Sequence, residues 1–446
     1  MASSLDTRKL QLIDRWVGMP VCGALSLMRR LLGGNRLEAS PVRPSKVLFI
    51  KFAEQGSTVL ARPAIGRAIE MVGRENVHFL VFEQNRCVLD LMALIPAENV
   101  ITVGHKSLLG AGIDALRALK RVRRLRIDAV IDLEFFSRSS AALAFLTGAR
   151  CRVGYHTFFG EGPYRGDLMT HRLLHNPYLH TSQSFQLMVE ALGQAPAQLP
   201  TYRSEVPKVN FERVDFVASP LEQEEVRAIL RRESGRAEDL RLILLNPNAS
   251  DLLPLRKWPP ERYVELARRL LERFPEVYVA MTGSPEEADA IDQIARSVGS
   301  ARCFSLAGKT TLRQLFVLYT LSELLVTNDS GPAHFASMTP ITVITLFGPE
   351  TPLLFGALSG RTIPIWMQIP CSPCVNAYNN RQSPCRNNLC MQAITVDHVL
   401  GVACQSYLDR RLGFARASRD DGGAHKAVVR VPGRPVSSRR EGPVTG

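Results

Sequence analysis

The 446-residue sequence predicts an α/β fold in which two Rossmann-like domains face a central cleft. Short apolar runs alternate with helical patterns along the chain, which is typical of doubly wound parallel sheets. The alternation occurs twice, and a polar segment rich in Glu and Arg separates the two series at about 205–240. Paired halves of this kind would hold a ligand between them, at the carboxyl ends of the strands.

The N-terminal half is predicted to span 46–205 as an acceptor domain. Its first buried strand, 46–50, leads into a polar loop at 51–58, and a helix follows as far as Glu70. The next apolar runs predict three further strands, at 77–82, 100–103 and 129–133.

The C-terminal half is predicted to span 240–400 as a donor domain. A closing helix is expected at 394–412. Beyond it, 413–446 is rich in Gly, Arg, Ser and Pro, which predicts a disordered basic tail. The apolar runs of this half predict strands at 242–245, 277–281, 324–326 and 342–347.

Most of the net charge of +13 lies at the two ends of the chain. Residues 1–45 contain seven Lys and Arg against three acidic residues, and residues 405–446 contain nine against four. A fold that grips nucleic acid would concentrate charge in its domains, so no nucleic-acid partner is expected. Basic ends instead favour contact with an anionic membrane surface.

The basic N-terminal extension, 1–45, contains an apolar run at 16–28 that is too short to span a bilayer. Arg15 and Arg29 flank the run, so it could lie in the membrane interface as an amphipathic helix. The alternative is a helix packed on the main body. No secretory signal is evident, and nine cysteines in this length do not make a disulfide scaffold. We therefore expect a cytoplasmic protein that associates peripherally with the inner face of the cell membrane.

The stretch 327–336, Thr-Asn-Asp-Ser-Gly-Pro-Ala-His-Phe-Ala, follows an apolar run that predicts the end of a buried strand. Ser330 is a good helix cap, and the N–H groups of the helix after it would face the crevice beyond the sheet. Gly331 would let a ligand approach the backbone, and His334 could donate to a phosphate oxygen. Asp329 suits hydroxyls, amides or a cation better than an anion. The alternative is an ordinary capped helix with a buried histidine.

Five further motifs follow a fixed order in the C-terminal half. They are Asn246-Pro247-Asn248-Ala249-Ser250, Arg256-Lys257-Trp258-Pro259, Thr282-Gly283-Ser284-Pro285-Glu286-Glu287, Leu306-Ala307-Gly308-Lys309-Thr310 and Leu346-Phe347-Gly348-Pro349. Together with 327–336, these motifs resemble glycosyltransferase family 9, the ADP-heptose:lipopolysaccharide heptosyltransferases and their relatives. The resemblance covers about 46–400. It implies a GT-B arrangement and an inverting transfer without a metal or cofactor, the nucleotide-sugar donor being a substrate.

The resemblance also implies roles for individual residues. Lys257 would meet the donor diphosphate and offset the charge on the leaving nucleotide. Ser250 would hydrogen-bond phosphate, and Glu286 or Glu287 would grip the ribose hydroxyls. The alternatives are a surface lysine beside a packed Trp258, and first-turn acids that complement a helix dipole.

The motif at 327–336 would complete the donor site. Asp329 would meet the sugar, while Ser330, Gly331 and His334 would meet the phosphates.

The N-terminal half departs from the family pattern in the loop after its first strand. Many members have Gly-Asp there, and that Asp is the base that deprotonates the acceptor hydroxyl, but this chain has Gly56-Ser57. Serine cannot accept a proton at neutral pH without a base of its own. Glu54, the nearest carboxylate, is our candidate base, and a solvent-exposed loop acid is the alternative. The same departure would fit a non-catalytic relative that only binds nucleotide-sugar.

Four cysteines lie within twenty residues, at Cys371, Cys374, Cys385 and Cys390. Structural zinc is one interpretation, although the second and third spacings match no standard finger. A disulfide and free thiols are the others.

The sequence thus predicts a glycosyltransferase that moves a sugar, heptose from ADP-heptose being the expected case, to a lipopolysaccharide-core or other envelope glycan acceptor. Dehydrogenases and epimerases are disfavoured, because no Gly-x-Gly-x-x-Gly follows either first strand.

Overall fold

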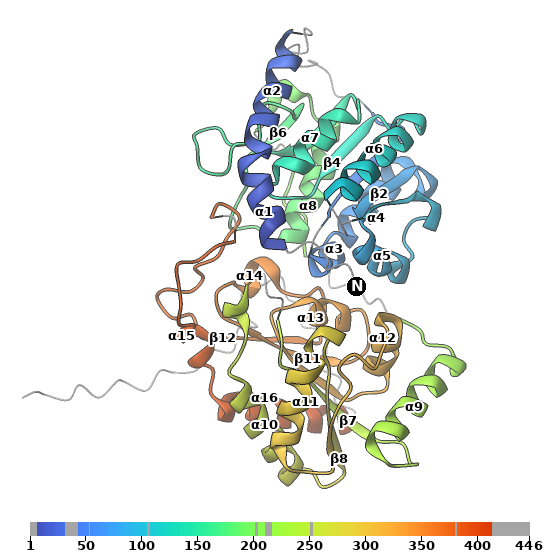
Figure 1. Cartoon of the computed structure of the whole chain (residues 1–446), viewed down its shortest axis with the longest axis vertical. Helices are drawn as coiled ribbons and strands as arrows, with labels where there is room; N and C mark the ends of the chain where they lie inside the picture. The colour runs from blue at the N-terminus through green and yellow to red at the C-terminus, as the bar shows by residue number, and fades with distance from the viewer. Residues whose placement is uncertain are drawn as a thin grey trace, which may run out of the picture.

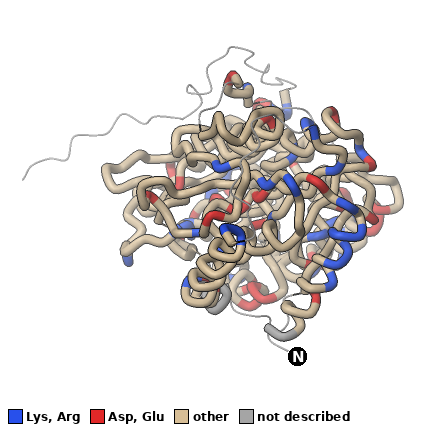
Figure 2. The backbone as a smooth tube through the Cα atoms, turned by 90° about the horizontal axis from the view of Figure 1, so that it is seen from above, with Lys and Arg blue, Asp and Glu red and all other residues tan. Residues whose placement is uncertain are grey.

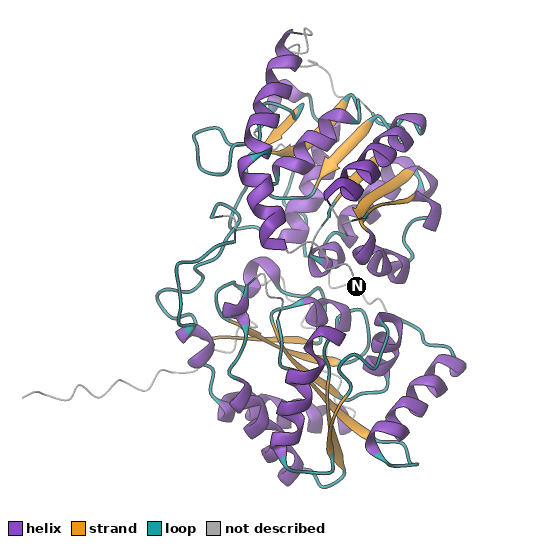
Figure 3. Ribbon diagram, viewed as in Figure 1, coloured by secondary structure: helices purple, strands orange, loops and turns teal. Residues whose placement is uncertain are grey.

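The computed structural model describes residues 7–31, 43–52, 54–104, 108–200, 204–209, 216–249, 253–379 and 381–412. The predicted tail at 413–446 lies outside the described residues, and so does Ser250. The chain forms two α/β halves, one above the other in Figure 1. In each half, helices flank a parallel sheet (Figure 3). The predicted fold class is confirmed.

The upper sheet belongs to the N-terminal half and has the strand order β3-β2-β1-β4-β5-β6, with every pair parallel. Its strands are β1 Val47–Ile50, β2 Val77–Phe82, β3 Val100–Val103, β4 Ala129–Asp132, β5 Cys151–Tyr155 and β6 His171–Leu173. Its helices are α3 Gln55–Leu60, α4 Arg62–Val72, α5 Arg86–Met92, α6 Leu108–Arg124, α7 Arg138–Leu146 and α8 Thr181–Glu190.

Helices cover both faces of this sheet, which explains why β1 is apolar at every position. Successive side chains of a strand point to opposite faces. Val47 and Phe49 accordingly join the core beneath α4 and α8, whereas Leu48 and Ile50 join the core beneath α6 and α7.

The lower sheet belongs to the C-terminal half and has the order β12-β11-β10-β7-β8-β9, again parallel throughout. Its strands are β7 Arg241–Asn246, β8 Val277–Met281, β9 Cys303–Ser305, β10 Leu324–Asn328, β11 Thr342–Phe347 and β12 Thr362–Trp366. Its helices are α9 Pro220–Ser234, α10 Pro260–Arg273, α11 Ala288–Val298, α12 Leu312–Thr320, α13 Gly331–Ala336, α14 Pro352–Phe355, α15 Leu389–Gln392 and α16 Val396–Arg411.

Both sheets have the same topology when each is counted from its own first strand. The order is 3-2-1-4-5-6, so the chain reverses direction across the sheet between β1 and β4, and again between β7 and β10. Ligands of open α/β sheets bind at such switch points, beyond the carboxyl ends of the strands. The topology therefore marks the loops after β1, β4, β7 and β10 as the place for a site.

Two N-terminal helices, α1 Thr7–Trp16 and α2 Gly18–Leu31, lie against α7 along one side of the upper sheet (Figure 1). Asp14 accepts hydrogen bonds from the backbone N–H groups of Arg138 and Ser139, at 3.0 and 2.8 Å, and so caps α7. Cys22 on the inner side of α2 is fully buried. The apolar run at 16–28 is thus packed on the main body through one face.

The opposite face of these helices is apolar and exposed. Trp16, Leu27 and Leu31 are 70%, 58% and 77% exposed. No helix in the described ranges is long and apolar enough to cross a membrane.

Candidate active site between the two sheets

The two switch points face each other. α3, which follows β1, packs against α13, which follows β10. The contact is close at Gly56, where an added Cβ would lie 2.5 Å from Cδ2 of His334. Any larger residue at this position would have to push the two helices apart. The glycine therefore lets the loop that carries Glu54 reach the motif at 327–336.

Asn328, the last residue of β10, fastens the donor-side loops together. Its Oδ1 accepts hydrogen bonds from the N–H of Trp258 and the hydroxyl of Tyr263, both at 3.1 Å. Its Nδ2 donates to the carbonyl of Pro247 at 2.8 Å. All three contacts are buried, so this one amide fixes the loop after β7 against the end of β10.

Asp329 and Glu350 form a buried pair of carboxyl groups at the ends of β10 and β11. Burial raises the pKa of Asp329, although Arg256 lowers it. Burial and the adjacent Asp329 raise the pKa of Glu350 well above the ordinary value. Oδ2 of Asp329 is buried without a hydrogen-bond partner in the described part of the chain, so a ligand hydroxyl could satisfy it.

His334 is buried in the first turns of α13. Burial, together with nearby His180 and Arg256, lowers the pKa of His334 to about 3, so the ring is neutral. Its Nδ1 has no hydrogen-bond partner among the described residues. A neutral imidazole can donate one hydrogen bond to a phosphate oxygen.

Ser330 occupies the N-cap position of α13, as predicted, but its side chain makes no capping hydrogen bond. The hydroxyl donates instead to the carbonyl of Asn328 at 3.2 Å. The expected side-chain cap was therefore wrong, because the extended backbone of Ser330 turns its hydroxyl back toward the strand. Gly331 is the first residue of the helix.

Lys257 and the two acids after β8 lie on loops at the carboxyl edge of the lower sheet. Lys257 is half-buried, next to the packed Trp258. Oε2 of Glu287 accepts a hydrogen bond from the N–H of Ser284 at 2.8 Å, which is the contact expected of a first-turn acid. Glu286 is exposed.

Glu54 lies at the N-terminus of α3 with φ of 66°, and its side chain is 23% exposed. Its Oε2 accepts a hydrogen bond from the hydroxyl of Ser57 at 3.0 Å and lies 3.4 Å from Nζ of Lys51. The alternative of a freely exposed loop acid does not describe this residue. Ser57, which stands where many relatives have the base, donates to the candidate base instead.

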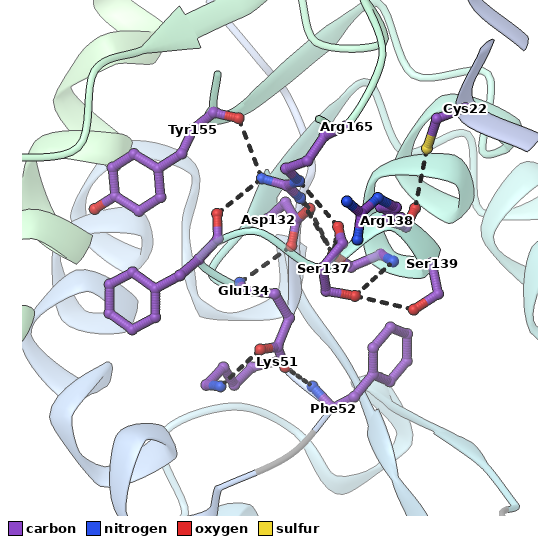
Figure 4. Close-up of polar contacts among 12 residues, drawn as sticks. Cys22, Lys51, Phe52, Asp132, Glu134, Ser137, Arg138, Ser139, Tyr155 and Arg165 are labelled. Carbon is purple, nitrogen blue, oxygen red and sulfur yellow. Dashed lines mark hydrogen bonds and ion pairs between the residues drawn. The ribbon is translucent and has the colours of Figure 1, made fainter. Parts of the chain in front are cut away.

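Lys51 is fully buried and lies between two carboxylates. Its Nζ contacts Oε2 of Glu134 at 2.9 Å, and Oε1 of Glu134 accepts the N–H of Phe52 at 2.7 Å (Figure 4). Glu134 follows β4, the strand next to β1, so this pair closes the upper switch point.

Arg165 holds the loop that carries Glu134 (Figure 4). Its guanidinium forms an ion pair with buried Asp132 and donates to the carbonyls of Phe135 and Ser137 at 3.1 and 2.9 Å. Burial raises the pKa of Asp132 to about 6, against the lowering effect of Arg165.

Arg381, from the segment between β12 and α15, joins the two halves. It forms an ion pair with Oε1 of Glu54 in the upper half. Its Nε and Nη2 also contact Oε1 of Glu350, at 2.9 and 2.5 Å, in the lower half. The candidate base and the donor-side carboxyl pair are thereby linked through one guanidinium.

The four clustered cysteines are free thiols, as are the other five of the chain. Sγ of Cys374 accepts a hydrogen bond from the hydroxyl of Ser383 at 3.2 Å, and burial raises the pKa of Cys390 to about 11. In the described ranges, no group of three or more His, Cys, Asp or Glu is arranged to hold a metal ion. Zinc at Cys371, Cys374, Cys385 and Cys390 stays a prediction.

Comparison with known proteins decides the family. The model of glycosyltransferase family 9 (heptosyltransferase) matches residues 115–383, more than half of the chain. The chain belongs to glycosyltransferase family 9. The resemblance stated from its motifs is confirmed.

Relatives within family 9 are similar over different lengths. Lipopolysaccharide heptosyltransferase 2 of Salmonella typhimurium is 34% identical over 102 residues, which cover 22% of this chain and 29% of that protein. The lipopolysaccharide core heptosyltransferase OpsX of Haemophilus influenzae is 23% identical over 70% of this chain and 81% of its own length. The match to the first of these thus spans less than a third of that relative.

Solved family 9 structures share the fold. The Escherichia coli ADP-heptose lipopolysaccharide heptosyltransferase II superposes with a TM-score of 0.62 at 19% identity, over 82% of this chain and 99% of that one. The family 9 glycosyltransferase from Veillonella parvula gives a TM-score of 0.61 at 17% identity.

Sequence reasoning missed several charged site residues of this family 9 chain, although the positions of some in the sequence could have identified them. Lys51 and Glu134 are the first charged residues after apolar strands that are neighbours at a switch point, and that position alone could have selected them. No local pattern marks Arg381, whose partner Glu54 lies in the other half. The missed residues are Lys51, Glu134, Arg256, Glu350 and Arg381.

Proposed function

We propose that the protein is an inverting glycosyltransferase that moves heptose from ADP-heptose to a lipopolysaccharide-core or other envelope glycan acceptor. The observation that carries the proposal is the meeting of two switch points, with a fixed carboxylate on one side and the motif at 327–336 on the other. Family membership and relatives that are named for heptose transfer support the choice of sugar.

In the proposed reaction, Glu54 accepts the proton of the acceptor hydroxyl. The hydroxyl oxygen forms a bond to the anomeric carbon of the heptose, and the bond from that carbon to the β-phosphate oxygen breaks. The electron pair leaves with ADP. Attack from the face opposite the leaving group inverts the configuration.

The donor would be held by the C-terminal half. Lys257 would offset charge on the departing diphosphate, and neutral His334 would donate a hydrogen bond to it. Asp329 would accept from a sugar hydroxyl, a role that its unpartnered Oδ2 supports. Ser330 and Gly331 would contribute at the phosphates.

Two further donor contacts rest on the family resemblance. Ser250 would hydrogen-bond the phosphates, and Glu286 or Glu287 would bind the ribose. Exposed Glu286 is the freer of the two acids, because Glu287 already closes its own turn.

The first test is a titration of the full chain with ADP, UDP, GDP and CMP, followed by a transfer assay with ADP-heptose. We expect selective ADP binding that weakens at least about tenfold in Lys257→Ala, since a charge-assisted contact is lost. Lys120→Ala, an exposed lysine on α6, is the matched control and should bind as the wild type does. Absence of binding to every nucleotide would overturn the proposal. Binding without transfer would favour the non-catalytic alternative.

We further propose that the enzyme rests on the anionic inner face of the cell membrane through α1 and α2. Their outer face is apolar and exposed, and Arg15 and Arg30 beside it are exposed as well. Basic α6 lies on the far side of α7, where Nη2 of Arg123 contacts the carbonyl of Leu146 at 2.6 Å. Several Lys and Arg segments also gather along one side of the molecule in Figure 2. Apolar side chains among basic ones suit an anionic interface.

Point substitutions test this better than truncation, because removing α1 and α2 would also remove the cap of α7 and uncover the core. Trp16→Glu with Leu27→Glu should reduce co-sedimentation with vesicles that contain phosphatidylglycerol and leave nucleotide binding unchanged. Leu221→Glu, at an exposed leucine of α9, is the control. Equal sedimentation of all three proteins would contradict membrane docking by this face.

A further inference from the structure

Arg381 occupies the boundary between the two halves, although no motif gives it a role. Its guanidinium contacts one carboxylate from each half, Glu54 and Glu350. The ring of Phe355 in the lower half lies 5.1 Å from Cζ, so the guanidinium is also held over an aromatic face. These contacts anchor Arg381 to the C-terminal half and leave one edge of its fork for Glu54.

Both oxygens of the Glu54 carboxylate are engaged. Oε1 pairs with Arg381, and Oε2 is shared by Ser57 and Lys51. Ser57 and Lys51 lie within three residues of Glu54 in the same half, so they accompany it whatever the domains do. Among the described partners of Glu54, Arg381 is the one from the other half, and its contact exists only while the halves are together.

A line of alternating acidic and basic side chains therefore crosses the cleft. Each member contacts the next, and buried ionisable groups of this kind depend on their neighbours for compensation. The line runs Glu350, Arg381, Glu54, Lys51 and Glu134.

We propose that Arg381 is a positioning residue that orients the Glu54 carboxylate when the donor-binding half closes on the acceptor-binding half. The inference rests on the proposed function, in which Glu54 accepts the acceptor proton. Arg381 acts through Glu54 and need touch neither substrate. In an open enzyme Ser57 and Lys51 would hold Oε2 of Glu54, and Oε1 would be fixed only when the two halves, and the substrates between them, come together.

Arg381 also places a cation against this carboxyl group, and an opposite charge in contact favours the charged form. The other groups near Glu54 are few. His334, which packs on Gly56, is neutral, and Lys51 lies 3.4 Å from Oε2 of Glu54 but is closer to Glu134. Charged residues on the helices against α3 form ion pairs of their own. These pairs are Arg86 with Asp90 and Arg67 with Glu190.

A double-mutant cycle on the full chain tests the proposal. We expect kcat of Arg381→Ala to fall about tenfold, because the base is no longer oriented, while its Kd for ADP stays within about twofold of wild type. If Arg381 acts through Glu54, adding Arg381→Ala to Glu54→Gln should change kcat by less than about twofold. Arg227→Ala removes an arginine ion pair with Asp239 in the same half and serves as the control.

The pH profile separates orientation from general damage to the fold. An opposite charge in contact favours the ionised form of a carboxyl, so we expect the acidic limb of kcat to move up by about one pH unit in Arg381→Ala. Arg381→Lys retains the charge and should keep the limb in place. A structural role alone would lower kcat without moving the limb.

The outcomes are distinct. If the wild type transfers sugar but the two substitutions act independently, or the limb does not move, the role of Arg381 is wrong and the proposed function stands. If the wild type binds nucleotide and transfers nothing, the proposed function fails, and the inference fails with it.

Discussion

The two switch points have one strand order but opposite chemistry. The upper one is charged: Lys51 lies fully buried between Glu134 and Glu54, and the carboxylates are held by cations and N–H groups. The lower one is framed by a neutral amide, that of Asn328, and burial raises the pKa of Asp329 beside it. Identical topology thus supports two unlike surfaces.

The difference matches the role proposed for each side, which is proton acceptance on the upper side and donor binding on the lower side. A carboxyl group must be ionised to accept a proton, and cations in contact with it favour the ionised form. A surface that holds a sugar diphosphate is better without fixed negative charge, because the ligand brings its own. The fold decides where ligands bind, while the loops after each strand decide what the site can do.

The largest expected effect comes from removing the negative charge of Glu54 on the upper side. Glu54→Gln keeps the shape and the hydrogen bond from Ser57 but cannot accept a proton. We expect kcat to fall at least about 100-fold, with little change in ADP binding. Steady-state transfer rates measure this, and a rate within a few-fold of wild type would exclude Glu54 as the base.

Gly56→Ala should have the next largest effect, because it wedges the two sides apart. The new Cβ would lie 2.5 Å from the His334 ring, so the loop of Glu54 must move back. A displacement of this size is expected to lower kcat about 10- to 100-fold. Gly66→Ala, where nothing lies within 4 Å of the added Cβ, is the control. Full activity in Gly56→Ala would show that catalysis does not need this contact.

On the lower side, losing the amide of Asn328 should reduce the stability of the fold. Asn328→Ala leaves the buried N–H of Trp258 and hydroxyl of Tyr263 without an acceptor. We expect the free energy of unfolding to fall by about 3 kcal/mol, with weaker ADP binding because the loop of Lys257 loosens. Urea denaturation gives the first value and titration the second.

Asn76→Ala is the comparison for that variant, since its amide makes only a local bond to the carbonyl of Val72. It should cost about 1 kcal/mol or less. Equal losses in both variants would mean that Asn328 does not organise the donor loops.

Strands could be predicted well from the sequence where they are long and lie inside a sheet. The runs at 77–82, 277–281 and 342–347 match β2, β8 and β11. The strands β5, β6, β9 and β12 were not predicted individually. β6 and β9 have only three residues each, and Arg in β5 and Pro in β12 interrupt their apolar runs.

The donor residues could be proposed from sequence because they are local motifs at strand ends. The contacts that set Glu54 could not, since Arg381 lies in the other half of the chain and only the closed arrangement brings the two together. The hydroxyl direction of Ser330 was missed for a smaller reason: residue type predicts a cap, but backbone geometry decides it.

The smallest predicted effect concerns the lower side: the contribution of Asp329 to the stability of the fold should depend on pH. The native state binds the Asp329 proton more tightly than the unfolded chain, since burial raises its pKa above the ordinary 3.8. Stability changes with pH in proportion to the protons bound by the unfolded state minus those bound by the native state, so this residue costs stability as pH rises above that value. Asp329→Asn removes the cost, and its Tm relative to wild type should increase steadily from acid toward neutral pH. Asp239→Asn, at an exposed aspartate, should show no such trend. A Tm difference that shrinks with pH would mean that the effect of Arg256 on the pKa of Asp329 outweighs that of burial, and the contrast drawn between the two sides would then fail.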